Sequence, residues 1–146
     1  MTAQIGERLT YQGESLIMCT SPLSDFFVYG DSWPRFARTN TGLWRNYIGT
    51  WEIVNDRLYL IGLEATMMDG TPATLATVFP DFPDRVFAHW YSGELRVPRG
   101  NLIKYVHSGF RNKYEKDLFL DVANGVLTGT RLVKNNITEV ENESDG

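Results

Sequence analysis

The sequence predicts a mainly β fold, an antiparallel barrel or sandwich with one or two short helices. Short runs rich in aromatic and β-branched residues recur along the chain, and turn-forming residues separate them at short intervals. Strands that follow one another this closely pair as antiparallel neighbours, because parallel pairing needs a long crossover. With 42% hydrophobic and 13% aromatic residues, the chain of 146 residues can bury one core.

The length fits a single β-rich domain, which we place at residues 1–134. The remaining segment, residues 135–146, carries acidic side chains and no basic ones, and we expect it to be a disordered acidic tail. Without this segment the net charge of -4 disappears and the body is neutral. A neutral body predicts that the protein binds neither nucleic acid nor an anionic membrane surface.

The first half of the chain predicts two hairpins, whose strands we place at residues 8–11 with 15–19 and at residues 44–54 with 57–63. In the second hairpin Asn55-Asp56 lies between the strands, and both residues tolerate the positive φ of a tight two-residue turn. The region between the hairpins is less regular. There Pro22 suits the start of a single helical turn that reaches Phe27.

The second half begins with a predicted helix at 72–79, because Thr71 can cap it and Pro72 suits its first position. Strands are then predicted at residues 85–91, 94–97, 102–107, 117–123 and 126–133. We interpret Pro98-Arg99-Gly100 as a turn. Asn124-Gly125 is the strongest hairpin signal in the chain.

Two histidines, His89 and His107, are the candidates for acid–base chemistry, because imidazole titrates near neutral pH. If their strands pair, the two rings approach each other near Asp117 or Glu115 and could serve a small hydrolase or lyase. The alternative is that each histidine packs beside aromatic residues at a strand end. No phosphate-binding loop, zinc-type cysteine cluster or serine-nucleophile motif is present, so we predict no cofactor and no metal.

Aromatic residues and one arginine supply the candidates for a binding surface: Trp44, Arg45, Tyr47, Tyr91 and Tyr114. Trp44-Arg45 follows a loop signal, so we expect the pair at an exposed edge, where Arg45 could bind an anionic group. The alternative for Arg45 is a surface or salt-bridged arginine. Trp51, Tyr59 and Trp90 lie in more apolar runs, and we predict them in the core.

Several segments resemble a family of small uncharacterised bacterial proteins. They are LWRNYIGTWEI at 43–53, RLYL at 57–60, VFAHWYSGEL at 86–95, YVHSGF at 105–110 and YEKDL at 114–118. The resemblance covers most of residues 5–133 and implies a bacterial or phage-associated cytoplasmic protein. It implies no activity and no catalytic residue, because we know of no assigned function for that family.

Three alternatives for function follow. The first is a non-enzymatic binding or protein-interaction module, with another protein or a small ligand as partner and an exposed apolar patch on an edge strand or near Trp44. The second is the hydrolase or lyase that uses His89 and His107. The third is a β-barrel that binds a small apolar ligand in an internal cavity. We favour the first, because no catalytic signature is present.

The expected location is the cytoplasm. The single cysteine, Cys19, cannot form an internal disulfide, so nothing indicates an oxidising compartment. The N-terminus lacks the pattern of a signal peptide. No apolar run approaches the length that spans a membrane.

Overall fold

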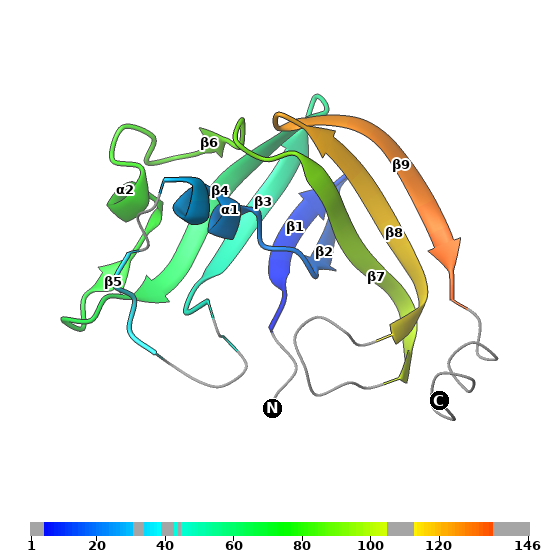
Figure 1. Cartoon of the computed structure of the whole chain (residues 1–146), viewed down its shortest axis with the longest axis horizontal. Helices are drawn as coiled ribbons and strands as arrows, with labels where there is room; N and C mark the ends of the chain where they lie inside the picture. Colours follow the sequence, from blue (N-terminus) through cyan, green and yellow to red (C-terminus); the bar gives the residue numbers. More distant parts are fainter. Residues whose placement is uncertain (1–4, 31–33, 39–42, 44, 105–112, 136–146) are drawn as a thin grey trace.

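The computed structural model describes residues 5–30, 34–38, 43, 45–104 and 113–135 (Figure 1). Within them the strands are β1 (Glu7–Tyr11), β2 (Glu14–Met18), β3 (Ile48–Val54), β4 (Arg57–Thr66), β5 (Pro72–Ala73), β6 (Val86–Phe87), β7 (Gly93–Lys104), β8 (Lys113–Ala123) and β9 (Val126–Lys134). The helices are α1 (Pro22–Tyr29) and α2 (Leu75–Val78). The fold is therefore mainly β with two short helices, and the predicted fold class is confirmed.

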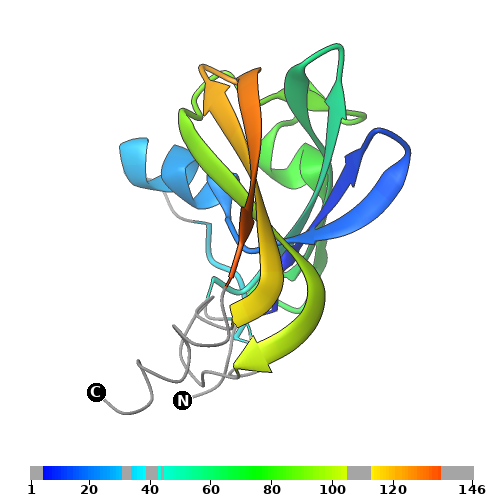
Figure 2. The ribbon, with the colours of Figure 1, turned by 90° about the vertical axis from the view of Figure 1, so that its right-hand side faces the viewer.

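One strongly curved sheet forms the body, with the strand order β2-β1-β3-β4-β9-β8-β7 and with β5 and β6 attached to β4 (Figures 1 and 2). Its pairings are antiparallel except that of β1 with β3, which is parallel and sets Leu9 beside Trp51. The sheet is not closed into a barrel by strand pairing. Within the described residues its edge strands β2 and β7 approach each other through a backbone bond from Cys19 to Arg96 O, 2.8 Å. Of the two predicted architectures, the sandwich fits.

The core lies inside this curve, and α1 packs against it. Leu23 and Phe27 are one helical turn apart and both are buried, which fixes the face that α1 turns inward. The helix continues beyond the single turn predicted from the sequence and ends at Gly30, whose N–H donates to Phe26 O over 3.0 Å. No helix in the described part of the chain has the length and apolarity needed to cross a membrane.

The short helix in the middle of the chain begins later than predicted. Pro72 and Ala73 pair with the end of β4 as strand β5, so they are not helical. Thr74 caps α2 in place of Thr71, and its partner in the capping box is Thr77, whose hydroxyl accepts the Thr74 N–H at 2.9 Å. The correction reflects a long-range strand pairing that local signals do not contain.

Two strand predictions in the second half also change. Pro98-Arg99-Gly100 is not a turn but lies inside β7, where Gly100, at φ 82°, stands at an irregularity in the pairing with β8. Proline is tolerated there because β7 is an edge strand. The strand predicted at 85–91 is reduced to β6, because the chain turns back after it and Tyr91 N–H donates to Ala88 O over 3.1 Å.

The two predicted two-residue hairpins are confirmed, and their turns meet. Asn55 and Asp56 have φ of 51° and 61°, and Asn124 and Gly125 have φ of 49° and 83°. Gly125 O accepts the N–H of Leu58 at 2.8 Å, which joins the β8–β9 turn to the start of β4. This junction ties the two halves of the sheet together.

Gly125 gives the first testable prediction, because an alanine Cβ would lie 2.7 Å from the carbonyl oxygen of Ala88 at a φ of +83°. We expect Gly125→Ala to lower the free energy of unfolding by about 2 kcal/mol or more, from backbone strain and from this contact. Gly13→Ala is the matched control, because Gly13 also has positive φ but no atom lies within 4 Å of the added methyl group. Urea denaturation checks the prediction, and equal losses in the two variants would contradict it.

The described chain ends at Asn135, the first residue after the predicted domain. Asn135 belongs to the domain, because its N–H donates to Glu115 O and its side-chain amide donates to Asp117 Oδ2 at 3.0 Å. The other residues of the predicted acidic tail, 136–146, lie outside the described residues.

Candidate functional site

His89 lies on the surface at the turn after β6. Its ring contacts the rings of Phe87 and Trp90, with centroids 6.5 Å and 5.6 Å away. Its predicted partner His107 lies outside the described residues. His89 therefore has the aromatic surroundings of the alternative interpretation, and the histidine pair stays a prediction.

The two carboxylates predicted near the histidines lie at the other end of the sheet, on β8. Asp117 is buried and holds Arg96 in an ion pair of 2.9 Å, while Asn135 donates to its second oxygen. Glu115 lies against the bulge at Gly100. No hydrogen bond or ion pair between described residues joins His89 to either carboxylate. Nor does the described chain contain a group of three or more His, Cys, Asp or Glu side chains arranged to hold a metal.

The predicted binding residues separate into buried and half-exposed ones. Trp44 lies outside the described residues. Tyr47 and Tyr91 are core residues, with Tyr47 fully buried and the Tyr91 hydroxyl donating to Glu94 O at 2.7 Å. Burial raises the pKa of Tyr91 to about 12, so its hydroxyl stays protonated at neutral pH. Tyr114 is half-buried and lines a groove of about 380 Å³ between β2 and β7.

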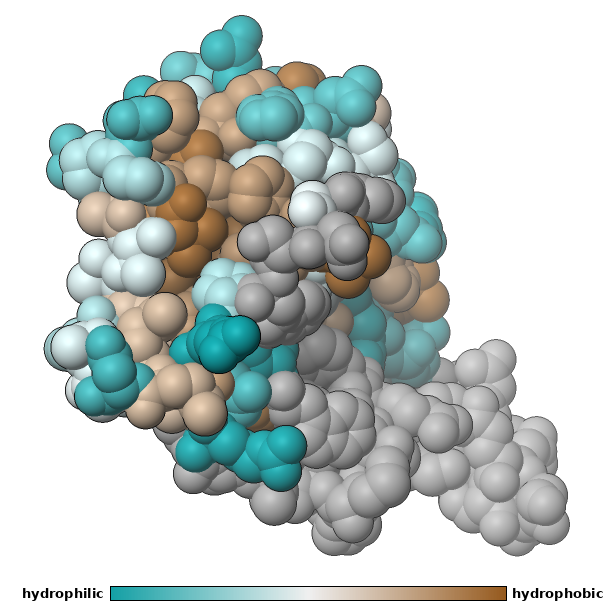
Figure 3. Space-filling model, turned by 60° about the vertical axis from the view of Figure 1, so that its left-hand side comes forward, coloured by the Kyte–Doolittle hydropathy of each residue, from teal (hydrophilic) through white to brown (hydrophobic). Residues whose placement is uncertain are grey.

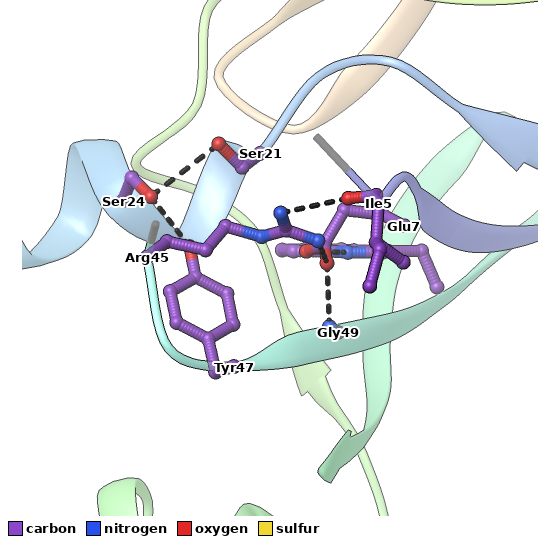
Figure 4. A network of polar contacts seen from close by, with 8 residues as sticks. Ile5, Glu7, Ser21, Ser24, Arg45, Tyr47 and Gly49 are labelled. Carbon is purple, nitrogen blue, oxygen red and sulfur yellow. Dashed lines mark hydrogen bonds and ion pairs between the residues drawn. The ribbon is translucent and has the colours of Figure 1, made fainter. Parts of the chain in front are cut away.

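Arg45 is not at an exposed edge, and this expectation is corrected. Its guanidinium is buried and forms an ion pair of 2.6 Å with Glu7, which is completely buried (Figure 4). The anion that Arg45 binds is therefore part of the protein itself. The cause is the parallel pairing of β1 with β3, which brings Glu7 beside the chain segment that follows Arg45.

A network of hydrogen bonds surrounds this ion pair (Figure 4). Glu7 Oε2 also accepts the backbone N–H of Gly49 at 2.7 Å, and Glu7 Oε1 accepts the indole N–H of Trp51 at 3.2 Å. Arg45 donates in addition to Ile5 O at 2.8 Å. Both carboxylate oxygens therefore have donors within the protein, as a buried charge requires.

Burial governs the protonation of this network. It raises the pKa of the Glu7 carboxyl, and the positive charge of Arg45 and the three hydrogen bonds oppose that rise. Burial and the neighbouring Glu7 also raise the pKa of Tyr47, whose hydroxyl shares a hydrogen bond of 2.5 Å with Ser24 Oγ. These groups hold one another inside the core, so we interpret the network as structural.

A cluster of three half-buried rings, Phe26, Phe79 and Trp90, is the strongest candidate for a functional surface, and we name it the aromatic patch. Phe26 comes from α1, Phe79 follows α2, and Trp90 lies in the loop after β6. Phe26 lies 5.0 Å from Phe79 and 4.9 Å from Trp90 between ring centroids, and Phe79 stacks on Trp90 at 5.7 Å. The Trp90 indole N–H donates to Pro22 O at 2.9 Å.

Exposed apolar and acidic side chains from the same segments accompany the aromatic patch. Phe82 is 52% exposed, and its backbone N–H donates to Phe79 O at 2.9 Å. Figure 3 shows an apolar area on the side of the molecule that carries α1 and α2. Asp25, Asp81 and Asp84 add three carboxylates that form no ion pair with another described residue. The surface thus combines apolar groups with unpaired negative charge.

The sequence interpretation missed most of this surface. The sequence pattern does not single out Phe26 or Phe79 as surface residues, and it predicts Trp90 in the core although that side chain is only half-buried. One signal is present in the sequence, because Leu23 and Phe27 define the inner face of α1 and leave Phe26 beside that face rather than on it.

Comparison of the chain with protein-family models, with curated proteins and with solved structures finds no match.

Proposed function

We propose that this protein is a non-enzymatic interaction module that binds a partner protein through the aromatic patch. The observation that carries the proposal is the contact of three half-buried aromatic rings, which come from α1, from the end of α2 and from the loop after β6. Burial of an apolar side chain is favourable, so the exposed parts of these rings would gain free energy if a partner covered them. Exposed apolar patches of this kind mark interaction sites.

The aromatic patch is suited to binding because its rings are already fixed. Each ring contacts the other two, and the hydrogen bond from Trp90 to Pro22 O holds the indole in place. A fixed aromatic side chain loses little conformational entropy when a partner covers it. Tryptophan is also among the residues that contribute most binding energy at interfaces.

The charges around the aromatic patch indicate the chemistry of the partner. Asp25, Asp81 and Asp84 favour a partner that presents arginine or lysine beside an apolar side chain. Burial raises the pKa of Asp25, because it partly removes the charged carboxylate from water. A positive charge on the partner would stabilise that carboxylate and offset this cost. An arginine could also stack on the indole of Trp90.

The resemblance to small bacterial proteins and the single cysteine support a bacterial cytoplasmic location for this module. Small-ligand binding is compatible with it, whereas the hydrolase alternative depends on His107 and draws no support from the surroundings of His89.

A comparison of two lysine variants tests the proposal. Phe82→Lys replaces an exposed apolar side chain next to Phe79 with a charge that repels a basic partner. Val133→Lys is the matched control, because Val133 is also exposed, at 38%, but belongs to β9. Full-length wild-type and variant proteins serve as bait for capture from the native host, and captured polypeptides are then purified and titrated by calorimetry.

We expect a polypeptide that the wild type and Val133→Lys bind equally and that Phe82→Lys binds at least tenfold more weakly, a change of about 1.4 kcal/mol. Its affinity for the wild type should also fall with added salt, because the acidic side chains contribute. The proposal fails if every captured polypeptide binds Phe82→Lys as tightly as it binds the control.

A further inference from the structure

We infer a second binding site, independent of the aromatic patch, for an amphipathic anion with an apolar tail. The site is a groove of about 520 Å³ between the β1–β2 hairpin and the strands β7, β8 and β9. Its volume lies within the range of small-molecule sites, about 300–1,000 Å³. β9 pairs with β4 only near Val126, so in the described chain the rest of its edge on that side has no strand partner.

One part of the groove is apolar. Tyr11 and Leu16 line it from the hairpin, and Leu118 and Leu132 line it from β8 and β9. Leu118 and Leu132 are partners in register and so lie on the same face of the sheet. Leu132 is 54% exposed although it faces the groove, so an apolar tail that covered it would gain buried surface.

The other part carries a row of cations across three neighbouring strands. Arg99 of β7 is in register with Lys116 of β8, and Lys116 is in register with Lys134 of β9. Like charges placed directly opposite each other on one face repel and destabilise a sheet. Lys116 lines the groove and, like Lys134, forms no ion pair with another described residue. An anionic head placed here would relieve that repulsion.

Two carboxylate side chains also line the groove and offset part of its positive charge. Glu14 on the hairpin pairs with Arg99 across the groove at 3.2 Å, and both side chains are partly exposed. Glu115 lies at the rim against Gly100. Arg99 is therefore occupied, whereas Lys116 is a cation of the groove lining with no ion-pair partner among the described residues. If Lys116 binds the anion, removal of its charge should weaken binding, whereas removal of the charge of Glu14 should strengthen it.

Calorimetric titration of the full chain with dodecanoate and with dodecyl phosphate tests the site. We expect the wild type to bind at least one of these anions, and the tighter one identifies the head group. Dodecan-1-ol, which has the tail without the charge, should bind at least tenfold more weakly, and acetate should not bind. Absence of binding of both long-chain anions at millimolar concentration, or equal binding of dodecan-1-ol, overturns the inference.

Two substitutions then locate the site. Lys116→Gln should weaken binding of the anion about tenfold, because it removes a charge-assisted hydrogen bond. Glu14→Gln should strengthen binding several-fold, because it frees Arg99 for the ligand. Arg85→Gln is the control, since Arg85 lies over the Tyr59 ring, away from the groove, and should leave affinity unchanged. Thermal unfolding confirms that each variant is folded, and unchanged affinity in folded Lys116→Gln overturns the inference.

Discussion

Arg45→Met is expected to lower the free energy of unfolding by about 3–5 kcal/mol, the usual cost of removing one partner of a buried ion pair. Methionine retains an apolar stem of similar length, so the packing of that stem changes little. The loss arises because Glu7 remains completely buried and, among the described residues, keeps the backbone N–H of Gly49 and the indole N–H of Trp51 as its donors. Urea denaturation followed by far-ultraviolet circular dichroism measures the change.

The chain contains a matched control for this experiment. Arg8 and Glu64 form an ion pair of 2.7 Å whose side chains are 52% and 58% exposed. Because solvent screens this pair, Arg8→Met should cost less than about 1 kcal/mol. Equal losses in Arg8→Met and Arg45→Met would show that the buried pair contributes no more than a surface one.

The stability that Arg45→Met loses relative to wild type should depend on pH, which provides a second, independent readout. Burial raises the pKa of folded Glu7 above its ordinary value of 4.5, and removal of Arg45 takes away the largest influence that lowers it. A carboxyl with a raised pKa binds its proton more tightly in the folded state, so its contribution to stability is complete below pH 4.5 and is lost as the pH rises. The deficit of the variant relative to wild type should therefore be smaller at pH 4.5 than at pH 8.

The features that the sequence predicted correctly are local in the chain. The hairpin turns at Asn55-Asp56 and Asn124-Gly125 follow from residues that tolerate positive φ, whatever surrounds them. The parallel contact of β1 with β3 has no such signal, because it joins strands that α1 and a long connection separate. Without that contact Arg45 looks like a surface residue, and its partner 38 positions earlier is not identifiable.

The candidate surfaces were harder to predict for the same reason. Whether an aromatic side chain is in the core or at the surface depends on which segments cover it. Trp51 was predicted in the core and is fully buried, because β1 and β4 lie on both sides of its strand. Trp90 comes from an equally apolar run but lies in a turn, where Phe26, Phe79 and His89 cover part of its ring. The groove likewise depends on where β9 leaves β4, which no local pattern specifies.

Gly49→Ala is the second substitution with a large expected effect, a loss of about 2–4 kcal/mol in the free energy of unfolding. An alanine Cβ would lie 2.7 Å from Glu7 Oε1 and 2.8 Å from Trp51 Nε1, closer than real Cβ atoms come to such neighbours. Neither neighbour can move freely, because both side chains are completely buried. The methyl group must therefore lengthen the hydrogen bonds of Glu7 or displace the indole.

Gly62→Ala distinguishes this effect from a general cost of changing glycine in a strand. Gly62 lies on β4 beside β3, and a Cβ there would meet Thr50 Cβ at an ordinary 3.5 Å. Alanine restricts the unfolded chain more than glycine does, so Gly62→Ala should be neutral or stabilise the protein by up to about 1 kcal/mol. If Gly49→Ala unfolds at the same urea concentration as wild type, position 49 tolerates a methyl group. The close approach of Glu7 and Trp51 to Gly49 would then not explain the glycine at this position.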